Sequence, residues 1–130
     1  RPNSSPTIID CIITGNDAIY GGGVTCRDNS SPLLQGCKIY ANGDDGLYCE
    51  DDANPELIDC EIYDNEQHGI LCSNSGLPSI PIITSTTICG NGNTQLLIKC
   101  DDCDVINGGG SCVSDSCDDN KPRPSNGRSS

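Results

Sequence analysis

The sequence predicts an all-β solenoid, a parallel β-helix of about four coils. Three observations support this prediction. A segment of about ten residues recurs four times at intervals of 23 to 26 residues, and repeats of that length are typical of solenoids. Apolar and polar residues alternate within each copy, which is the period of a strand. Gly, Asn, Asp, Ser and Pro separate the short apolar runs, as expected of turns.

The repeat is clearest when its copies are aligned on proline. SSPTIIDCIITGN at residues 4–16 is followed by SSPLLQGCKIYAN at 30–42, NPELIDCEIYDN at 54–65 and the degenerate PIITSTTICGN at 81–91. Successive prolines lie 26, 23 and 26 residues apart. In every copy an asparagine follows the proline by ten residues, and the four pairs are Pro6 and Asn16, Pro32 and Asn42, Pro55 and Asn65, and Pro81 and Asn91.

Each copy predicts three short strands. The first is marked by an apolar column of Ile8, Leu34, Leu57 and Ile83, and the second by Ile13, Ile39, Ile62 and Ile88. The third follows a glycine, as in GVTC at 23–26, GLYC at 46–49 and GILC at 69–72, and we align LIKC at 97–100 with these. Three strands joined by turns make one coil of a parallel β-helix, and stacking of coils creates the core that one coil lacks.

The recurring asparagines predict a ladder along one corner of the solenoid. Because equivalent residues of successive coils stack roughly 4.8 Å apart, their side-chain amides can bond from coil to coil and to the turn backbone. Four independent turn asparagines are the alternative, but the constant spacing favours a ladder. Its members are Asn16, Asn42, Asn65 and Asn91.

The repeat SSPTIIDCIITGN, with its later GGGVTC, resembles right-handed parallel β-helix proteins of the pectate-lyase-like group, in their cysteine-rich secreted or surface variety. The resemblance covers about residues 4–100. It implies a right-handed solenoid and says little about function, because the same coil serves lyases, adhesins and fibres.

Seven cysteines fall into two inward columns. The first contains Cys11, Cys37 and Cys60, with Thr86 in the fourth copy, and the second contains Cys26, Cys49, Cys72 and Cys100. Two interpretations compete: buried thiols acting as small apolar residues, or disulfides. Cysteines stacked coil to coil have parallel Cβ vectors, a poor disulfide geometry. Pairing within a coil fits the count better, joining Cys11 to Cys26, Cys37 to Cys49 and Cys60 to Cys72, although sequence cannot establish connectivity.

The remaining cysteines mark the end of the repeats. We expect β-helix repeats over residues 1–100, a cysteine-rich cap over 101–118 and a Pro/Ser-rich tail or linker over 119–130. Eleven cysteines with a single histidine favour disulfides and an extracellular or cell-surface location over zinc. Because eleven is odd, at least one thiol is free or bonded to another chain. The candidates for cap disulfides are Cys89, Cys103, Cys112 and Cys117.

Charge and composition exclude several partners. The formal net charge of −12, from 19 acidic and 7 basic residues, argues against binding nucleic acid or an anionic membrane. The sequence contains no run of 18 apolar residues, the length that a membrane-spanning helix needs. We expect no cofactor, with Ca²⁺ as the one ion that the acidic pairs could attract. These pairs are Asp44-Asp45, Asp51-Asp52, Asp101-Asp102 and Asp118-Asp119.

Catalytic and metal-binding residues are not predicted. The acidic residues lie in turns, and no basic residue shares their columns. We predict that the single histidine, His68, is an exposed turn residue. Asn3 and Asn29 begin glycosylation sequons at equivalent turns. Tyr40 and Tyr63 share an outward column, as a stacked pair on the sheet or as a contact for sugar rings.

These observations predict a non-enzymatic extracellular structural protein. The first coil begins at residue 4, so we expect either a longer solenoid or a second molecule over that end. Contact of one open end with another surface propagates into filaments, so the favoured partner is the chain itself, stacked head to tail in a filament or surface layer, with bound or covalent glycans as further partners. The alternatives are an adhesin or carbohydrate-binding module of a larger surface protein and, more remotely, a relic of a polysaccharide lyase or hydrolase.

Overall fold

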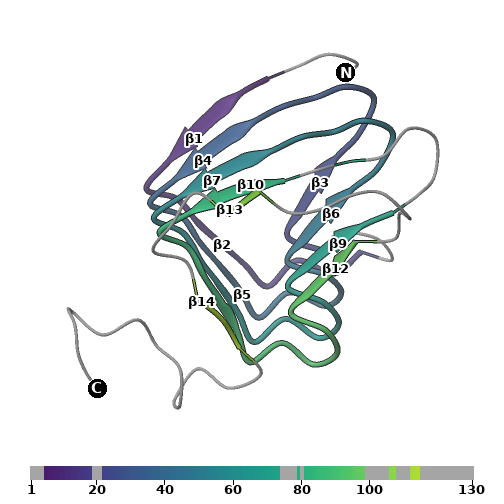
Figure 1. Ribbon diagram of the computed structural model, residues 1–130. Coiled ribbons are helices and arrows are strands. Elements are labelled where there is room, and N and C mark those ends of the chain that lie inside the picture. Colours follow the sequence, from purple (N-terminus) through teal and green to yellow (C-terminus); the bar gives the residue numbers. More distant parts are fainter. Residues whose placement is uncertain are drawn as a thin grey trace.

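The structure is a computed structural model that describes residues 5–18, 22–73, 79, 81–98, 106–107 and 112–114. Within these residues, strands β1 to β14 form three parallel sheets around a common interior (Figure 1). Each coil contributes one strand to each sheet before the chain moves on to the next coil. The predicted all-β parallel β-helix is confirmed. No helix in this part of the chain is long and apolar enough to cross a membrane.

The three sheets differ in the strand that each coil supplies. Sheet A contains the first strands, β1 (Thr7–Ile9), β4 (Leu33–Gln35), β7 (Glu56–Ile58), β10 (Ile82–Thr84) and β13 (Ile106–Asn107). Sheet B contains the second, β2 (Ile12–Thr14), β5 (Lys38–Tyr40), β8 (Glu61–Tyr63), β11 (Thr87–Cys89) and β14 (Cys112–Ser114). Sheet C contains the third, β3 (Val24–Cys26), β6 (Leu47–Cys49), β9 (Ile70–Cys72) and β12 (Leu96–Ile98).

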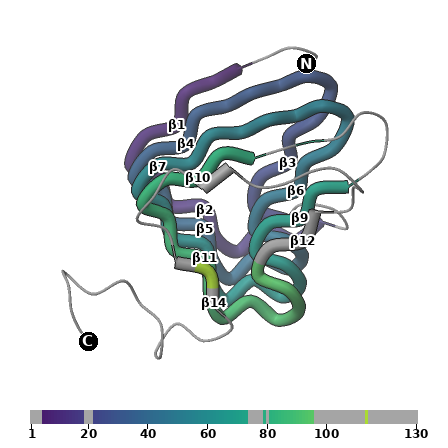
Figure 2. Tube along the Cα trace, in the orientation of Figure 1, coloured from purple at the N-terminus to yellow at the C-terminus, as the bar shows by residue number. Residues whose placement is uncertain are grey.

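The register stacks the columns that the repeat predicts. In sheet A, Leu34 pairs with Ile8 and Leu57, and in sheet B, Ile39 pairs with Ile13 and Ile62. These inward side chains are fully buried from the second coil onward, whereas Ile8 and Ile13 of the first coil are only partly buried. Figure 2 shows the coils lying on one another from the purple N-terminal coil to the green one. Stacking therefore supplies the core, and the first coil is its least covered layer.

At the two corners that flank sheet B, one residue in each coil has a positive φ angle. Between sheets A and B it is Asp10, Gly36, Asp59 or Ser85, and after sheet B it is Gly15, Ala41, Asp64 or Gly90, all with φ between 48° and 72°. The left-handed region is open to Gly and accessible to Asp and Asn at modest cost. This explains why Gly and Asp recur at these corners.

The last strands continue the solenoid beyond the fourth coil. β13 pairs with β10 and β14 pairs with β11, both in parallel, so two short strands of the predicted cap extend the coils. The rest of the predicted cap at 101–118, and all of the tail at 119–130, lie outside the described residues.

The fourth strand of sheet C corrects one alignment. Its register places Leu96, Leu97 and Ile98 over Ile70, Leu71 and Cys72. Ile98, not Cys100, therefore continues the second cysteine column, and assigning Cys100 to that column was wrong. The alignment followed the cysteine, whereas backbone pairing between β12 and β9 sets the register. Cys100 lies outside the described residues.

Candidate functional site at the asparagine corner

The corner after sheet B, which we call the asparagine corner, carries the predicted ladder. The Oδ1 atom of Asn91 accepts the backbone N–H of Asn65 at 3.0 Å and its side-chain amide at 2.9 Å. Asn65 accepts the same two donors of Asn42, and Asn42 accepts those of Asn16. Each rung thus satisfies two N–H groups of the preceding coil with one oxygen atom. The ladder has a direction, because the acceptor always belongs to the later coil.

Gln95 ends this ladder. Its Oε1 atom accepts the backbone N–H of Asn91 at 3.0 Å and the side-chain amide of Asn91 at 2.8 Å. These are the two bonds that an asparagine of a following coil would accept. The Gln95 Nε2 atom also donates to the Asn91 carbonyl at 3.2 Å. The Gln95 side chain, which belongs to the same coil as Asn91, therefore takes the place of the next asparagine in the ladder.

Gln95 occupies a position that is glycine in the earlier coils. Gly23, Gly46 and Gly69 precede β3, β6 and β9 as Gln95 precedes β12. A Cβ atom at Gly69 would lie 2.5 Å from Ile88 Cγ2 and 2.8 Å from Asn91 Nδ2, both in the next coil. Such distances are shorter than real Cβ contacts, so with any residue other than glycine at this position a neighbouring coil could stack only after a local shift. Sequence reasoning missed Gln95, although aligning it with the three glycines would have revealed it.

The opposite end of the ladder is open among the described residues. Asn16 is exposed, and its Oδ1 atom accepts no hydrogen bond from them. Strands β1, β2 and β3 are the outermost strands of their sheets. Ile9 and Ile12 of this coil are the most exposed large apolar residues described, at 53% and 64%. The first coil thus offers backbone edges, apolar side chains and an acceptor oxygen.

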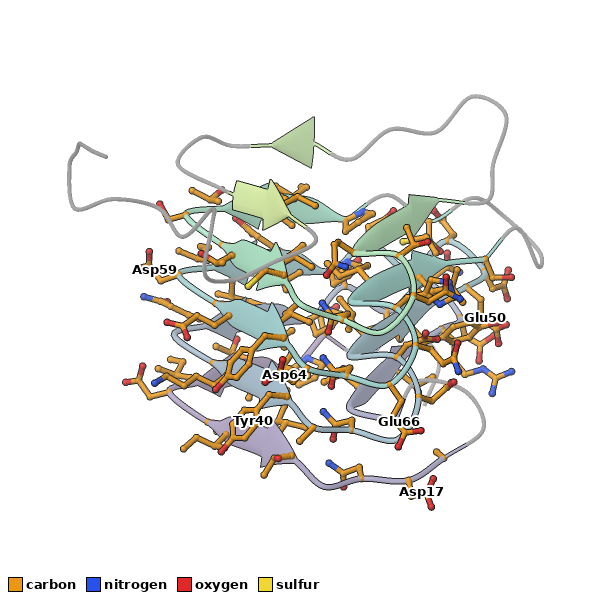
Figure 3. The ribbon with its side chains drawn as sticks, turned by 90° about the horizontal axis from the view of Figure 1, so that it is seen from below. Asp17, Tyr40, Glu50, Asp59, Asp64 and Glu66 are labelled. Carbon is orange, nitrogen blue, oxygen red and sulfur yellow. The ribbon has the colours of Figure 1, made fainter. Side chains whose placement is uncertain are left out.

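A surface pocket of about 510 Å³ lies at the asparagine corner of the first coils. Its acidic lining residues are Asp17, Asp64 and Glu66 (Figure 3). No group of three or more His, Cys, Asp or Glu residues in the described part of the chain is arranged to hold a metal ion. The pocket is lined by Gly15, Asn16, Asp17, Ala41, Asn42, Gly43, Asp64 and Glu66. The expectation that Ca²⁺ binds this chain therefore stays a prediction.

Tyr40 and Tyr63 stack on the outer side of sheet B. Their ring centroids lie 4.9 Å apart and their planes differ by 8°, so each ring covers one face of the other. Burial, and then the negative charge that the Tyr40, Glu61 and Asp64 side chains can carry, raise the pKa of Tyr63. The strand register places Thr14 of the first coil beside Tyr40 and Cys89 of the fourth coil beside Tyr63. This geometry favours the cross-strand interpretation over contact with a sugar ring.

His68 is more buried than predicted. Its side chain is 14% exposed, and its Nδ1 atom lies 2.8 Å from Oδ1 of Asp45, which is 2% exposed. The same Asp45 oxygen accepts the backbone N–H of His68 at 3.0 Å. The prediction of an exposed turn histidine was wrong, because stacking places the Asp45 carboxylate of the second coil against the third-coil turn.

Of the other acidic pairs, Asp51-Asp52 is the one that lies within the described residues, next to Glu50. Glu50 accepts a hydrogen bond from the Tyr48 hydroxyl at 2.9 Å and pairs with Arg27 at 2.8 Å. Asp51 and Asp52 both adopt positive φ angles in the turn that follows. The pairs Asp101-Asp102 and Asp118-Asp119 lie outside the described residues.

The two cysteine columns contain thiols. Cys11, Cys26, Cys37, Cys49, Cys60 and Cys72 are free, so the predicted pairing within each coil was wrong. Thiols of adjacent coils interact: Cys49 forms hydrogen bonds with Cys26 and Cys72, and these bonds, together with burial, raise the pKa of Cys49. Burial also raises the pKa of Cys60. All are buried except Cys11, which the open first coil leaves exposed.

The remaining predicted residues are only partly described. Cys89 is disulfide-bonded. Cys112 begins β14, whereas Cys103 and Cys117 lie outside the described residues, as does Asn3. Asn29 is exposed, with a φ angle of 64° in a turn, and its N–H donates to the Asp51 carbonyl. Its side chain is thus accessible for modification.

Comparison with known proteins identifies one family. A family model described as a right-handed β-helix region matches residues 1–124. No curated protein and no solved structure gives a significant match to the chain.

Proposed function

Since the chain belongs to the right-handed β-helix family, we propose that it is a non-catalytic structural module of the cell exterior that stacks end to end with a second copy of itself. The observation that carries this proposal is the complementarity of its two ends. At the N-terminal end Asn16 has an acceptor that no described residue uses, and at the other end Asn91 has the two matching N–H donors, which Gln95 accepts within the single chain. A second copy stacked in parallel would continue the ladder across the junction.

The backbone of the first coil supports the same arrangement. The Pro6 carbonyl accepts a hydrogen bond from the Leu33 N–H, and the Asp10 N–H donates to the Gln35 carbonyl. The backbone groups of Pro6 and Asp10 therefore point toward β4. Because hydrogen-bonding direction alternates along a strand, the N–H and C=O groups of Ile9 point away from β4. The same reasoning applies to Ile12, since Cys11 O and Gly15 N–H bond toward β5. Unpaired edges of this kind recruit further strands.

Two further observations support an extracellular location. Cys89 is disulfide-bonded, and structural disulfides persist in oxidising compartments. The sequon at Asn29 lies in an exposed turn, as glycosylation requires. We place a carbohydrate-binding module second, because the Tyr40 and Tyr63 rings cover each other.

Sedimentation velocity over a range of protein concentrations tests the proposal. The wild-type chain should form elongated oligomers whose size grows with concentration. An Ile9→Pro, Ile12→Pro variant should lose this association, because proline removes the outward N–H groups without breaking a bond inside the chain. An Ile9→Thr, Ile12→Thr variant is the matched control, since threonine already stands at the equivalent positions Thr84 and Thr87 and keeps the N–H.

The threonine control should associate more tightly than the proline variant. Negative-stain electron microscopy should show thin filaments in concentrated wild-type samples. A wild-type chain that stays monomeric at every concentration, or a proline variant that associates as well as the threonine control, would overturn the proposal.

A further inference from the structure

We propose that Gln95 is a built-in competitor of head-to-tail stacking, which holds the C-terminal end closed until another copy displaces it. This inference rests on the proposed function, because it concerns the same junction. Gln95 acts in two ways, through its amide and through its bulk. The two effects can be separated by substitution.

The amide of Gln95 occupies the acceptor position of an incoming coil. In every junction between coils, one Oδ1 atom accepts both the backbone and the side-chain N–H of the preceding asparagine. At Asn91 the Oε1 atom of Gln95 accepts both, at 3.0 Å and 2.8 Å. Asn16 of a second copy needs these same two donors. It can bind only when the Gln95 side chain leaves.

The bulk of Gln95 blocks the same place. A Cβ atom at Gly46 would lie 2.6 Å from Ile62 Cγ2 and 2.8 Å from Asn65 Nδ2 of the next coil, and Gly69 shows the same pattern. By this register, the Cβ atom of Gln95 points at the space that Ile13 and Asn16 of a second copy would fill. A glycine at 95 would leave that space open.

The rest of the C-terminal end is covered differently in the three sheets. β13 lies on the outer edge of β10 and β14 on that of β11, so stacking must also move these two short strands. Within the described residues, β12 has no strand on its outer edge. Gln95 directly precedes β12, so its side chain lies beside the strand edge at which a new coil can first dock.

The test compares Gln95→Gly with Gln95→Ala in the full chain by sedimentation velocity. Gln95→Gly removes both the amide and the Cβ atom, so its association constant should exceed that of the wild type at least about tenfold, as expected when two competing hydrogen bonds are lost. Gln95→Ala removes the amide but keeps the Cβ atom, so it should associate more tightly than the wild type but less tightly than Gln95→Gly. Adding Ile9→Pro and Ile12→Pro to Gln95→Gly should abolish the gain.

The outcomes separate this inference from the proposed function. Wild-type association that depends on the Ile9 and Ile12 edges, without any gain in Gln95→Gly, would overturn the competitor role and leave the function standing. Equal gains in Gln95→Gly and Gln95→Ala would overturn the steric role. A gain in Gln95→Gly that survives the two prolines would mean that the N-terminal coil is not the partner surface, and would overturn both.

Discussion

The Oδ1 atom of Asp45, in the second coil, lies 2.8 Å from Nδ1 of His68 and 3.0 Å from the backbone N–H of His68, in the third. One buried carboxylate oxygen therefore ties together two turns that are 23 residues apart in the sequence. The contact lies at the inner side of the asparagine corner, between the ladder and β6. It adds a side-chain contact between coils to the backbone and amide hydrogen bonds of the stack.

Replacing Asp45 tests the strength of this link. Asp45→Ala should lower the free energy of unfolding by about 1–3 kcal/mol, because the buried His68 N–H loses its acceptor. Urea denaturation measures the change. Glu66→Ala, which removes an exposed carboxylate from the neighbouring turn, is the control and should stay within about 0.5 kcal/mol of the wild type. Equal stability of the two variants would show that the contact contributes nothing.

The asparagine ladder should be strongest in its middle. Asn65→Ala removes an acceptor of two N–H groups and a donor to Asn91 Oδ1 and the Ile39 carbonyl, all buried. We expect a loss of about 3 kcal/mol or more in the free energy of unfolding. Asn16→Ala, at the exposed end, should cost about 1 kcal/mol or less. Chemical denaturation of both variants checks the difference, and similar losses would contradict a cooperative ladder.

Ala41 occupies a backbone conformation better suited to glycine. Its φ angle is 55°, and the equivalent corner residues in the first and fourth coils are Gly15 and Gly90. Ala41→Gly should raise the free energy of unfolding by about 0.5–1 kcal/mol. Relief of the left-handed strain stabilises the folded chain, and the greater conformational entropy of glycine in the unfolded chain offsets part of that gain. Ala53→Gly, at a buried residue without positive φ, should instead destabilise the fold. A destabilised Ala41→Gly would refute the strain argument.

Ionisation of the buried thiols should weaken the fold at high pH. The pKa of Cys49 is raised above its ordinary value of 9.0 by hydrogen bonds with Cys26 and Cys72 and by burial. The unfolded thiol therefore ionises first, and stability is lost as the pH rises from 9.0 toward the folded pKa. Urea unfolding at a series of pH values should show this fall, with a shallower slope in Cys49→Ala. An unchanged slope in that variant would assign the fall to other groups.

Alkylation distinguishes the exposed thiol from the buried ones. In the native chain iodoacetamide should modify Cys11 first, because the other five described free thiols are buried and react only after unfolding. Mass spectrometry of the digested chain measures the order. Unreduced peptides linking Cys37 to Cys49 would restore the within-coil disulfides that the structure excludes.

Much of the fold follows from local patterns in the sequence. The columns that begin with Ile8 and Ile13 were predictable because inward and outward side chains alternate along a strand, and a constant spacing repeats that alternation in every coil. The ladder was predictable for the same reason, since Asn42 and Asn65 hold one corner position. Periodicity places such residues without knowledge of any long-range contact.

The bonding state of the cysteines and the register of the last coil were not predictable in this way. The sequence shows that Cys37 and Cys49 share a coil, but only the packed structure shows that both are free and that Cys49 interacts with thiols of the neighbouring coils. Aligning Cys100 with Cys72 failed because the fourth copy departs from the repeat. There the pairing of β12 with β9 sets the register.

The sequence by itself thus determined the parallel β-helix, its columns and its asparagine corner, because these depend on period and turn chemistry. Only the tertiary structure decided how the stack ends. The role of Gln95 depends on its place at the end of a glycine column and on the two Asn91 N–H groups that its side chain accepts. The Asp45–His68 contact likewise exists only because stacking brings residues from successive turns within hydrogen-bonding distance.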